Sequence, residues 1–234
     1  MNSRCIEDFA VRLRRLEHYS EMVETFLASE AAALEARVVA GMNEHPPSDR
    51  QDYFEAFLDD ILEVSEDLPS LLRFSLVTAL DSAVEQLLVC SCQSYAKLMG
   101  LTLAQGDIRG STLERTRRYL KEIVRVPFPD HTQDWVHILR FRDLRNAIVH
   151  RDGTVDAAGQ PLRQWLLTQP GITLKGGHTI ALAASFIGHA IAVCNSFSHD
   201  LDAAFGVRPL MAFETGFEVE EATPPQASTD LTGQ

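Results

Sequence analysis

Apolar residues recur along most of this chain at every third or fourth position, the spacing that places them on one face of an α-helix. In the first forty residues this face carries Phe9, Leu13 and Leu27, and the pattern ends at Gly41. Residues 69–99 are mostly apolar, which is typical of a helix buried at the centre of a bundle. The pattern predicts helices over residues 1–40, 49–66, 69–99, 112–125, 132–150 and 179–205.

The residues between these helices fit the same pattern. Ser111 and Glu114 have the spacing of a capping box, which starts a helix. Residues 151–179 hold many of the glycines, and ITLKGGHTI, residues 172–180, predicts a small hairpin around two of them. No internal repeat and no long β pattern is present. The predicted fold class is all-α: a helical bundle with a short irregular or β-hairpin insert before the last helix.

The chain divides into three predicted parts. Residues 1–66 form an N-terminal helical extension, and residues 67–206 form the main helical domain. Residues 207–234 are acidic and rich in Pro, Thr, Gln and Gly from Glu214 onward, so a disordered tail is predicted there.

Charge is distributed unevenly. The net charge of −12 argues against a protein that coats nucleic acid without preference. Residues 109–151, here called the basic island, hold ten basic and five acidic residues, a net +5. Such an island can attract phosphate, or its charges can simply cover two solvated helix faces.

The sequence points to a cytoplasmic protein without a membrane anchor. Its start, MNSRCIEDFAVRLRR, mixes both charge signs and does not resemble a secretory signal. The most apolar window, residues 180–194, is shorter than the roughly 18 residues of a membrane span and contains His189. The cysteines have no metal-ligand spacing, so reduced structural thiols are expected. The four cysteines of the chain are Cys5, Cys90, Cys92 and Cys194.

The predicted helix 132–150 carries the residues with the most chemistry. At about 100° per residue, one face is apolar and belongs in the core, and a second face mixes apolar and polar residues. The core face holds Ile138, Phe141, Leu144 and Ile148. The second face holds Trp135, Leu139, Arg142, Asn146 and His150. Such a mixed face is expected to meet another helix or a partner molecule.

Three residues at the end of this helix can act together. Asn146 and His150 are neighbours at i and i+4, and Arg145 is long enough to join them from the border of the apolar face. An imidazole exchanges protons near neutral pH, and a guanidinium gives planar, always-charged contacts to phosphate. Alternatively, His150 is only a helix cap and Arg145 decorates the surface.

The string RNAIVH, residues 145–150, resembles the signature of the HEPN family (higher eukaryotes and prokaryotes nucleotide-binding domains): an Arg, a polar residue next to it, and a His shortly after. The similarity extends over roughly residues 69–205, so residues 67–206 are described as a HEPN-like domain. The resemblance implies a metal-independent endoribonuclease without cofactor, which forms a homodimer with one composite site. Many members are toxins or defence effectors.

Carried over residue by residue, the resemblance makes His150 the general acid/base, Arg145 the phosphate contact, and Asn146 a group that orients His150 or the phosphate. Arg142 and Arg151 are candidates for binding flanking phosphates of the RNA substrate. A two-fold dimer would present His150 twice, and in-line attack by a ribose 2′-OH needs both an acid and a base. Some family members carry a Tyr shortly after the His, and this chain does not.

Other interpretations remain open. A non-catalytic all-α module could dimerise through the same helix and bind a partner, such as an antitoxin or regulatory protein. A nucleotide-binding pocket is less favoured because the chain has no phosphate loop. Asp81 and Glu85, an acidic i, i+4 pair, form an exposed stripe or pair with the basic island. His137 and His189 are expected to be structural.

Overall fold

The computed structural model describes residues 3–156 and 161–206 of the chain. The predicted disordered tail, residues 207–234, lies outside the described residues. Within the described part, helices account for nearly all regular structure, and one short antiparallel hairpin precedes the last helix. The predicted class, an all-α bundle with a β-hairpin insert, is confirmed.

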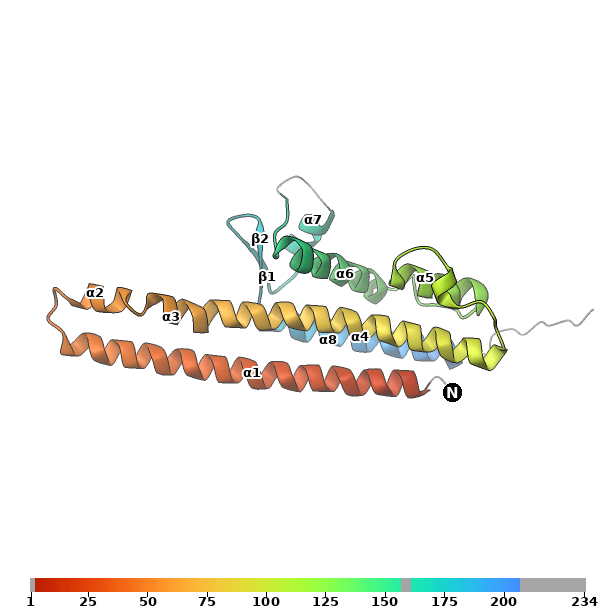
Figure 1. The fold of residues 1–234 in the computed structure, drawn as a ribbon, viewed down its shortest axis with the longest axis horizontal. Helices are drawn as coiled ribbons and strands as arrows, with labels where there is room; N and C mark the ends of the chain where they lie inside the picture. Colours follow the sequence, from red (N-terminus) through yellow and green to blue (C-terminus); the bar gives the residue numbers. More distant parts are fainter. Residues whose placement is uncertain (1–2, 157–160, 207–234) are drawn as a thin grey trace, which may run out of the picture.

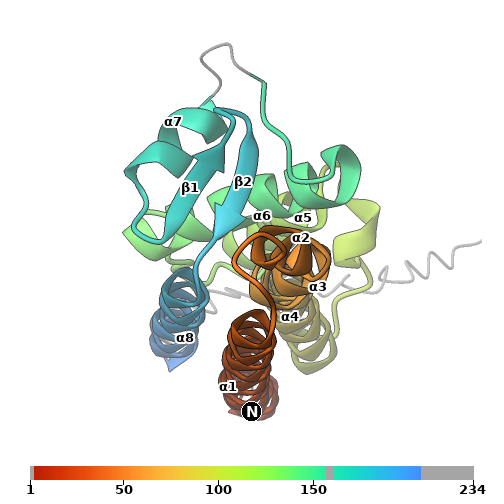
Figure 2. The ribbon, with the colours of Figure 1, turned by 90° about the vertical axis from the view of Figure 1, so that its left-hand side faces the viewer.

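Four long helices form the bundle: α1 (Ser3–Glu44), α4 (Leu68–Met99), α6 (Gln133–Arg151) and α8 (Ala184–Gly206). α1 runs antiparallel to α4, and α8 packs against both (Figure 1). α6 packs on α4 and α8, on the side away from α1 (Figure 2). α4 contacts the other three helices, which explains why its sequence is apolar on most sides.

One helical stretch of the described residues, Leu58–Met99, is long and apolar enough to cross a membrane. Half of its most apolar window is buried inside the protein. A core helix of a soluble protein has the same properties, so this stretch is weak support for a membrane span.

The predicted helix 49–66 is not continuous. It is divided into α2 (Arg50–Glu55) and α3 (Leu58–Leu62), and a π-helical turn, η1 (Glu63–Asp67), joins α3 to α4. None of these three elements contains a buried residue. These three elements pack mainly against α1, so few tertiary contacts stabilise a single continuous helix over residues 49–66.

The segment between α4 and α6 contains the predicted capping box. The Ser111 hydroxyl accepts from the Glu114 backbone N–H, and the Glu114 carboxylate accepts from the Ser111 N–H. The predicted helix 112–125 is shorter, with α5 (Thr112–Arg118) followed by a π-helical turn, η3 (Tyr119–Ile123). A short 3-10 turn, η2 (Gln105–Asp107), precedes it.

The insert before α8 contains the predicted hairpin and a helix that the sequence did not predict. β1 (Ile172–Lys175) pairs antiparallel with β2 (Thr179–Leu182), with Ile172 opposite Leu182. α7 (Pro161–Thr168) packs against β1 and α6. The start of the last helix was predicted at residue 179, which is wrong, because these apolar residues extend as β2.

α1 is part of the core rather than only an attachment. Its residues Ile6, Phe9 and Leu13 belong to the same buried cluster as the central residues of α4 and α8. A disulfide joins Cys5 to Cys90 and links α1 to α4, so the expectation of reduced thiols is wrong for this pair.

The other two cysteines are free thiols. Cys92 and Cys194 are buried, and burial raises the pKa of each thiol to about 12. Thiols that stay protonated near neutral pH are poor nucleophiles, so these two residues act as core packing groups.

Candidate functional site

The ends of α6 are set by local chemistry. At its start, the Thr132 hydroxyl accepts a hydrogen bond from the Trp135 backbone N–H. At its end, Asp152 and Gly153 adopt left-handed backbone angles, with φ of 49° and 69°. A Cβ at Gly153 would lie 2.9 Å from the Phe74 ring, so glycine is required there. This turn fixes where the residues just before it point.

α6 buries a wider arc than the sequence predicted. The predicted core residues Ile138, Phe141 and Leu144 are buried, and Ile148 is half-buried against the core. Trp135 was placed on the mixed face, and that placement is wrong. Only 4% of Trp135 is exposed, and its ring packs against those of Phe128 and Phe197, which lie 5.0 and 5.5 Å away. α6 packs on both α4 and α8, so two neighbouring helices cover it.

The solvent-facing side of α6, here called the α6 face, mixes apolar and polar residues. It consists of Val136, Leu139, Asn146, Val149 and His150. The three aliphatic side chains are between 41% and 47% exposed, as residues at an interface often are in the isolated chain. The sequence had identified only Leu139 among these three. Val136 and Val149 were missed, because the predicted face was rotated toward Trp135.

Arg145, Asn146 and His150 lie within the last two turns of α6, and Asn146 and His150 share the exposed α6 face. One guanidinium nitrogen of Arg145, Nη1, donates to Oδ1 of Asn146 at 3.2 Å. His150 is exposed, and its imidazole has no hydrogen-bond or ion-pair partner among the described residues. An imidazole in this position can accept or give a proton to a bound molecule.

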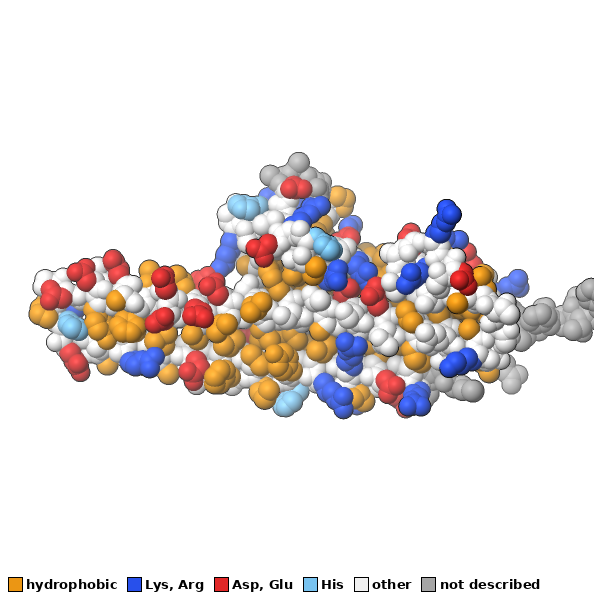
Figure 3. All heavy atoms as spheres, in the orientation of Figure 1, with side chains coloured by type: hydrophobic (Ala, Val, Ile, Leu, Met, Phe, Trp, Pro, Cys, Tyr) orange, Lys and Arg blue, Asp and Glu red, His pale blue; other side chains and the backbone are white. Residues whose placement is uncertain are grey.

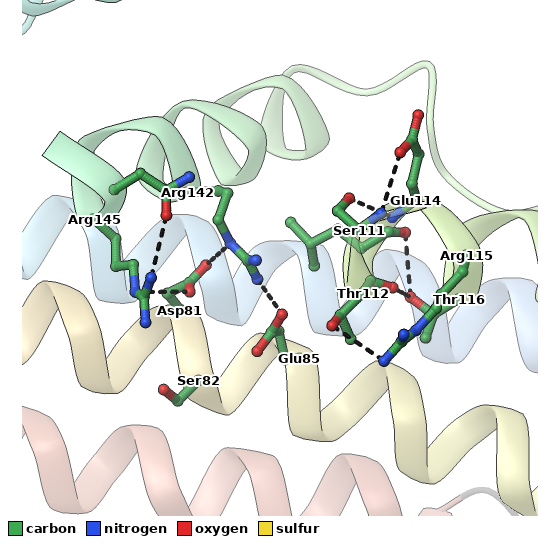
Figure 4. A network of polar contacts seen from close by, with 12 residues as sticks. Asp81, Ser82, Glu85, Ser111, Thr112, Glu114, Arg115, Thr116, Arg142 and Arg145 are labelled. Carbon is green, nitrogen blue, oxygen red and sulfur yellow. Dashed lines mark hydrogen bonds and ion pairs between the residues drawn. The ribbon is translucent and has the colours of Figure 1, made fainter. Parts of the chain in front are cut away.

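A buried carboxylate on α4 holds the two arginines beneath this face (Figure 4). Asp81 is 6% exposed, and its carboxylate accepts from Nε of Arg142 at 2.8 Å. Its other oxygen lies 3.9 Å from Nε of Arg145. Glu85, one turn further along α4, forms an ion pair with Arg142. Asp81 and Glu85 therefore pair with the basic island, one of the two roles that the sequence left open.

This arrangement changes the availability of the two arginines. Arg142 was a candidate for RNA binding, but both carboxylates engage its guanidinium, and its side chain is only 20% exposed. Among the described residues, the Arg145 guanidinium has only the long contact to Asp81 and the bond to Asn146, and its side chain is 29% exposed. Arg145 is therefore the guanidinium that can reach a bound phosphate. Arg151 is 52% exposed and forms an exposed ion pair with Asp156.

Burial dominates the electrostatics of this cluster. It raises the pKa of Asp81, and the hydrogen bond from Arg142 opposes that rise. Burial opposes the charge of Arg142, but the hydrogen bonds that its guanidinium donates to Glu85 and Asp81 prevail and raise its pKa. A carboxyl whose pKa is raised by folding contributes its full stability at low pH and loses part of it as pH rises through the folded-state pKa. Protonation of the Asp81 carboxyl at low pH is therefore not expected to destabilise this cluster.

Four other cations of the basic island form ion pairs with acids of the same island. Arg117 and Lys121 each contact the Asp130 carboxylate at 2.7 Å. Other cations of the island form exposed pairs at i, i+3 or i, i+4, which contribute little to stability. These are Arg118 with Glu122 and Arg140 with Asp143. These acids are already counted in the net +5 of the basic island, so these pairs leave that charge unchanged. The pairs of Arg142 with Asp81 and Glu85, which lie outside the island, offset part of it.

Asp130 gives a testable pH dependence. The hydrogen bond from Lys121 and that from Arg117 lower its pKa, so its contribution is present above the ordinary Asp pKa and is lost as pH falls through the folded-state value. Asp130→Asn should lower the free energy of unfolding by about 1 kcal/mol at neutral pH, and the difference should shrink below about pH 4. Urea unfolding at several pH values measures this. A constant difference across that range would contradict it.

Other candidate residues form no second site. His137 and His189 lie with ring centroids 5.7 Å apart between α6 and α8, and burial lowers the pKa of His137. The described residues contain no group of three or more His, Cys, Asp or Glu side chains that could hold a metal ion.

Comparisons with protein-family models, with curated proteins and with solved structures found no match to this chain.

Proposed function

We propose that the protein is a HEPN-type, metal-independent endoribonuclease whose site forms when two copies meet through the α6 face. One observation carries the proposal. His150 is exposed and has no hydrogen-bond or ion-pair partner among the described residues. It lies one turn from Asn146, which accepts a hydrogen bond from Arg145, and the Arg145 guanidinium lies near the buried Asp81 carboxylate. This combination supplies a proton-transfer group and a phosphate-binding cation within the last two turns of one helix.

The reaction needs two proton transfers. A base takes the proton of a ribose 2′-OH, the 2′-oxygen attacks the adjacent phosphorus, and the bond from phosphorus to the 5′-oxygen breaks. An acid gives a proton to the departing 5′-oxygen, which leaves a 2′,3′-cyclic phosphate and a 5′-OH. One chain supplies one His150, so the two roles fall to the two copies of His150 in a dimer. The Arg145 guanidinium stabilises the negative charge that develops on the phosphate.

The α6 face supports two-fold pairing. Val136, Leu139 and Val149 give it apolar area to bury, and a two-fold axis places the same residues on both sides of the interface. Because Asn146 and His150 lie on this same face, pairing brings both copies of the motif toward one groove. In this proposal, Arg142 positions Arg145 through Asp81, and Arg151 contacts flanking RNA phosphates.

The cellular setting is part of the same proposal. An RNase of this type would act in the cytoplasm as a toxin or defence effector, held in check by an antitoxin or another regulatory protein. The net charge of −12 fits an enzyme that meets RNA through a restricted site rather than over its whole surface. The Cys5–Cys90 disulfide is a bond that cytoplasmic proteins rarely keep, because thiols are held reduced there.

The 2′-OH requirement gives the test of this function. The protein should cut a labelled RNA in the presence of a metal chelator and leave 2′,3′-cyclic phosphate ends. Replacing the single ribose before the cut by deoxyribose should block cleavage at that position. Intact RNA under all conditions, or cleavage of the deoxy-substituted strand at the same place, would overturn the proposal.

A second candidate is a non-catalytic module that dimerises or binds a partner through the α6 face. The exposed Val136, Leu139 and Val149 favour it, because apolar area of this kind suits any helix partner. This candidate predicts that changing Arg145 or Asn146 alters dimerisation or partner binding, while no RNA cleavage is present to lose. The chelator assay therefore separates the two candidates.

A further inference from the structure

Nearly all of the net negative charge of the chain lies in one projecting part. Residues 21–71, here called the acidic arm, contain thirteen acidic residues and two arginines, a net −11 out of −12 for the whole chain. Two of these acids, Glu24 and Glu66, pair with Arg73 and Lys175 outside the arm. Figure 3 shows red side chains gathered over this end of the molecule and blue ones over the other.

The acidic arm is only two helical layers thick. It consists of the second half of α1 and the elements α2, α3 and η1 with the first turn of α4, and it extends beyond α6 and α8 (Figure 1). Because α2, α3 and η1 bury no residue, their outer sides have no packing partner within the described chain.

A row of exposed residues on α1 has the spacing of a helix–helix seam. Tyr19, Met22 and Phe26 follow one another at intervals of three and four, and are 47%, 56% and 60% exposed. The same spacing continues with small exposed residues along the arm: Ser29, Ala33, Ala36 and Ala40. Large side chains followed by small ones at this spacing match the ridge of a second helix laid along α1.

The neighbouring helix offers more apolar area at the same level. The ion pair between Arg73 and Glu24 sets the register of α4 against α1, so Leu71 lies level with residues near Phe26. Leu71 is 62% exposed. Figure 3 shows hydrophobic side chains gathered over α1 and α4 in this part of the molecule. A hollow in the arm is lined by three leucines and three acids: Asp59, Leu62, Glu63, Asp67, Leu68 and Leu71.

We propose that the acidic arm binds an amphipathic helix of another protein that carries leucine-like residues on one side and Lys or Arg around them. The seam on α1 and the exposed leucines accept the apolar side of that helix, and the surrounding carboxylates attract its cations. Long-range attraction to a net charge of −11 would also speed the encounter. This interaction is independent of the ribonuclease proposal, because α6 lies away from α1.

Other candidate partners for the acidic arm carry negative charge, which disfavours their binding to it. A second copy would bring an equally acidic arm against this one. The chain's own residues 207–234 hold five acids and one arginine, so they carry the same sign. A polynucleotide or an anionic membrane surface would be repelled as well. A basic helix is the occupant that both the apolar row and the charge favour.

The test uses the full chain and a labelled synthetic helix of about 20 residues, built from Leu on one side and Lys elsewhere. Fluorescence anisotropy should show binding that weakens as salt rises, and a peptide with Glu in place of Lys should not bind. The double variant Phe26→Ser, Leu71→Ser should weaken binding by about tenfold or more. Leu98→Ser is the matched control, because Leu98 is a 59% exposed leucine on the same helix, far from the arm.

Each other result overturns the proposal. Equal binding of the Lys and Glu peptides would remove charge as the basis, and an equal loss in the Leu98→Ser control would show non-specific adhesion. Tighter binding of a synthetic peptide of residues 207–234 would make the chain's own tail the occupant. A change of oligomeric state in the double variant, measured by light scattering, would make it a second copy. Circular dichroism verifies that each variant is folded.

Discussion

Replacing His150 by alanine is expected to lower the rate of RNA cleavage by about 10²- to 10⁴-fold, the usual contribution of a general acid or base. The loss should be large because a dimer of the variant lacks both proton-transfer groups at once. The affinity for RNA should change far less, since Arg145 and its support by Asp81 remain. Single-turnover cleavage of a labelled RNA, with binding measured separately, gives both quantities.

The matched control is His18→Ala. His18 is also exposed, but it lies on α1, away from α6. This variant should cut at the wild-type rate. Since neither histidine is buried, both variants should unfold at the wild-type urea concentration. If His150→Ala cuts RNA as fast as wild type, the assignment of His150 as the acid and base is wrong.

The second large effect is expected at Asp81. Removing its carboxylate by Asp81→Ala leaves Arg142 and Arg145 half-buried without this acceptor, which should lower the free energy of unfolding by about 2–3 kcal/mol. The loss should lie at the low end for a buried pair, because Glu85 still contacts Arg142. RNA cleavage should slow too, because the Arg145 guanidinium loses the carboxylate that positions it. Urea unfolding at neutral pH measures the stability.

Two further variants make the Asp81 prediction specific. Asp81→Asn keeps an oxygen acceptor for Arg142, and burial already disfavours the charged carboxylate, so this variant should lose only about 1 kcal/mol. Asp143→Asn removes a 45% exposed partner of Arg140, and should change stability by less than about 0.5 kcal/mol. Equal losses for Asp81→Ala and Asp143→Asn would contradict the structural role given to Asp81.

The helical spacing of apolar residues was enough to predict the bundle, its central helix and the hairpin around residues 176–177. This spacing could not predict where tertiary contacts decide between a helix and a strand. Residues 179–182 are apolar enough for either a helix or a strand, and pairing with β1 decides for a strand. The Cys5–Cys90 bond joins positions 85 residues apart, a proximity that no local spacing encodes.

The candidate site was predictable where it depends on one helix. Asn146 and His150 lie on the same exposed face because they are one turn apart, and Arg145 is half-buried at the border, as the angle around the helix implies. Trp135 was placed on the wrong face because the angle of a residue around the helix axis does not show how many other helices cover that helix. The pairing of Arg142 with Asp81 joins two helices, so the sequence left it as one of two alternatives.

The central claim, one reaction centre shared by two chains, is tested most directly by mixing subunits. Wild type and His150→Ala are mixed in equal amounts and allowed to exchange, and RNA cleavage is measured at constant total protein. If both copies of His150 act in one centre, only wild-type pairs are active, and random pairing leaves about a quarter of the wild-type rate. A rate of about one half would mean that each chain acts alone, and would contradict the account.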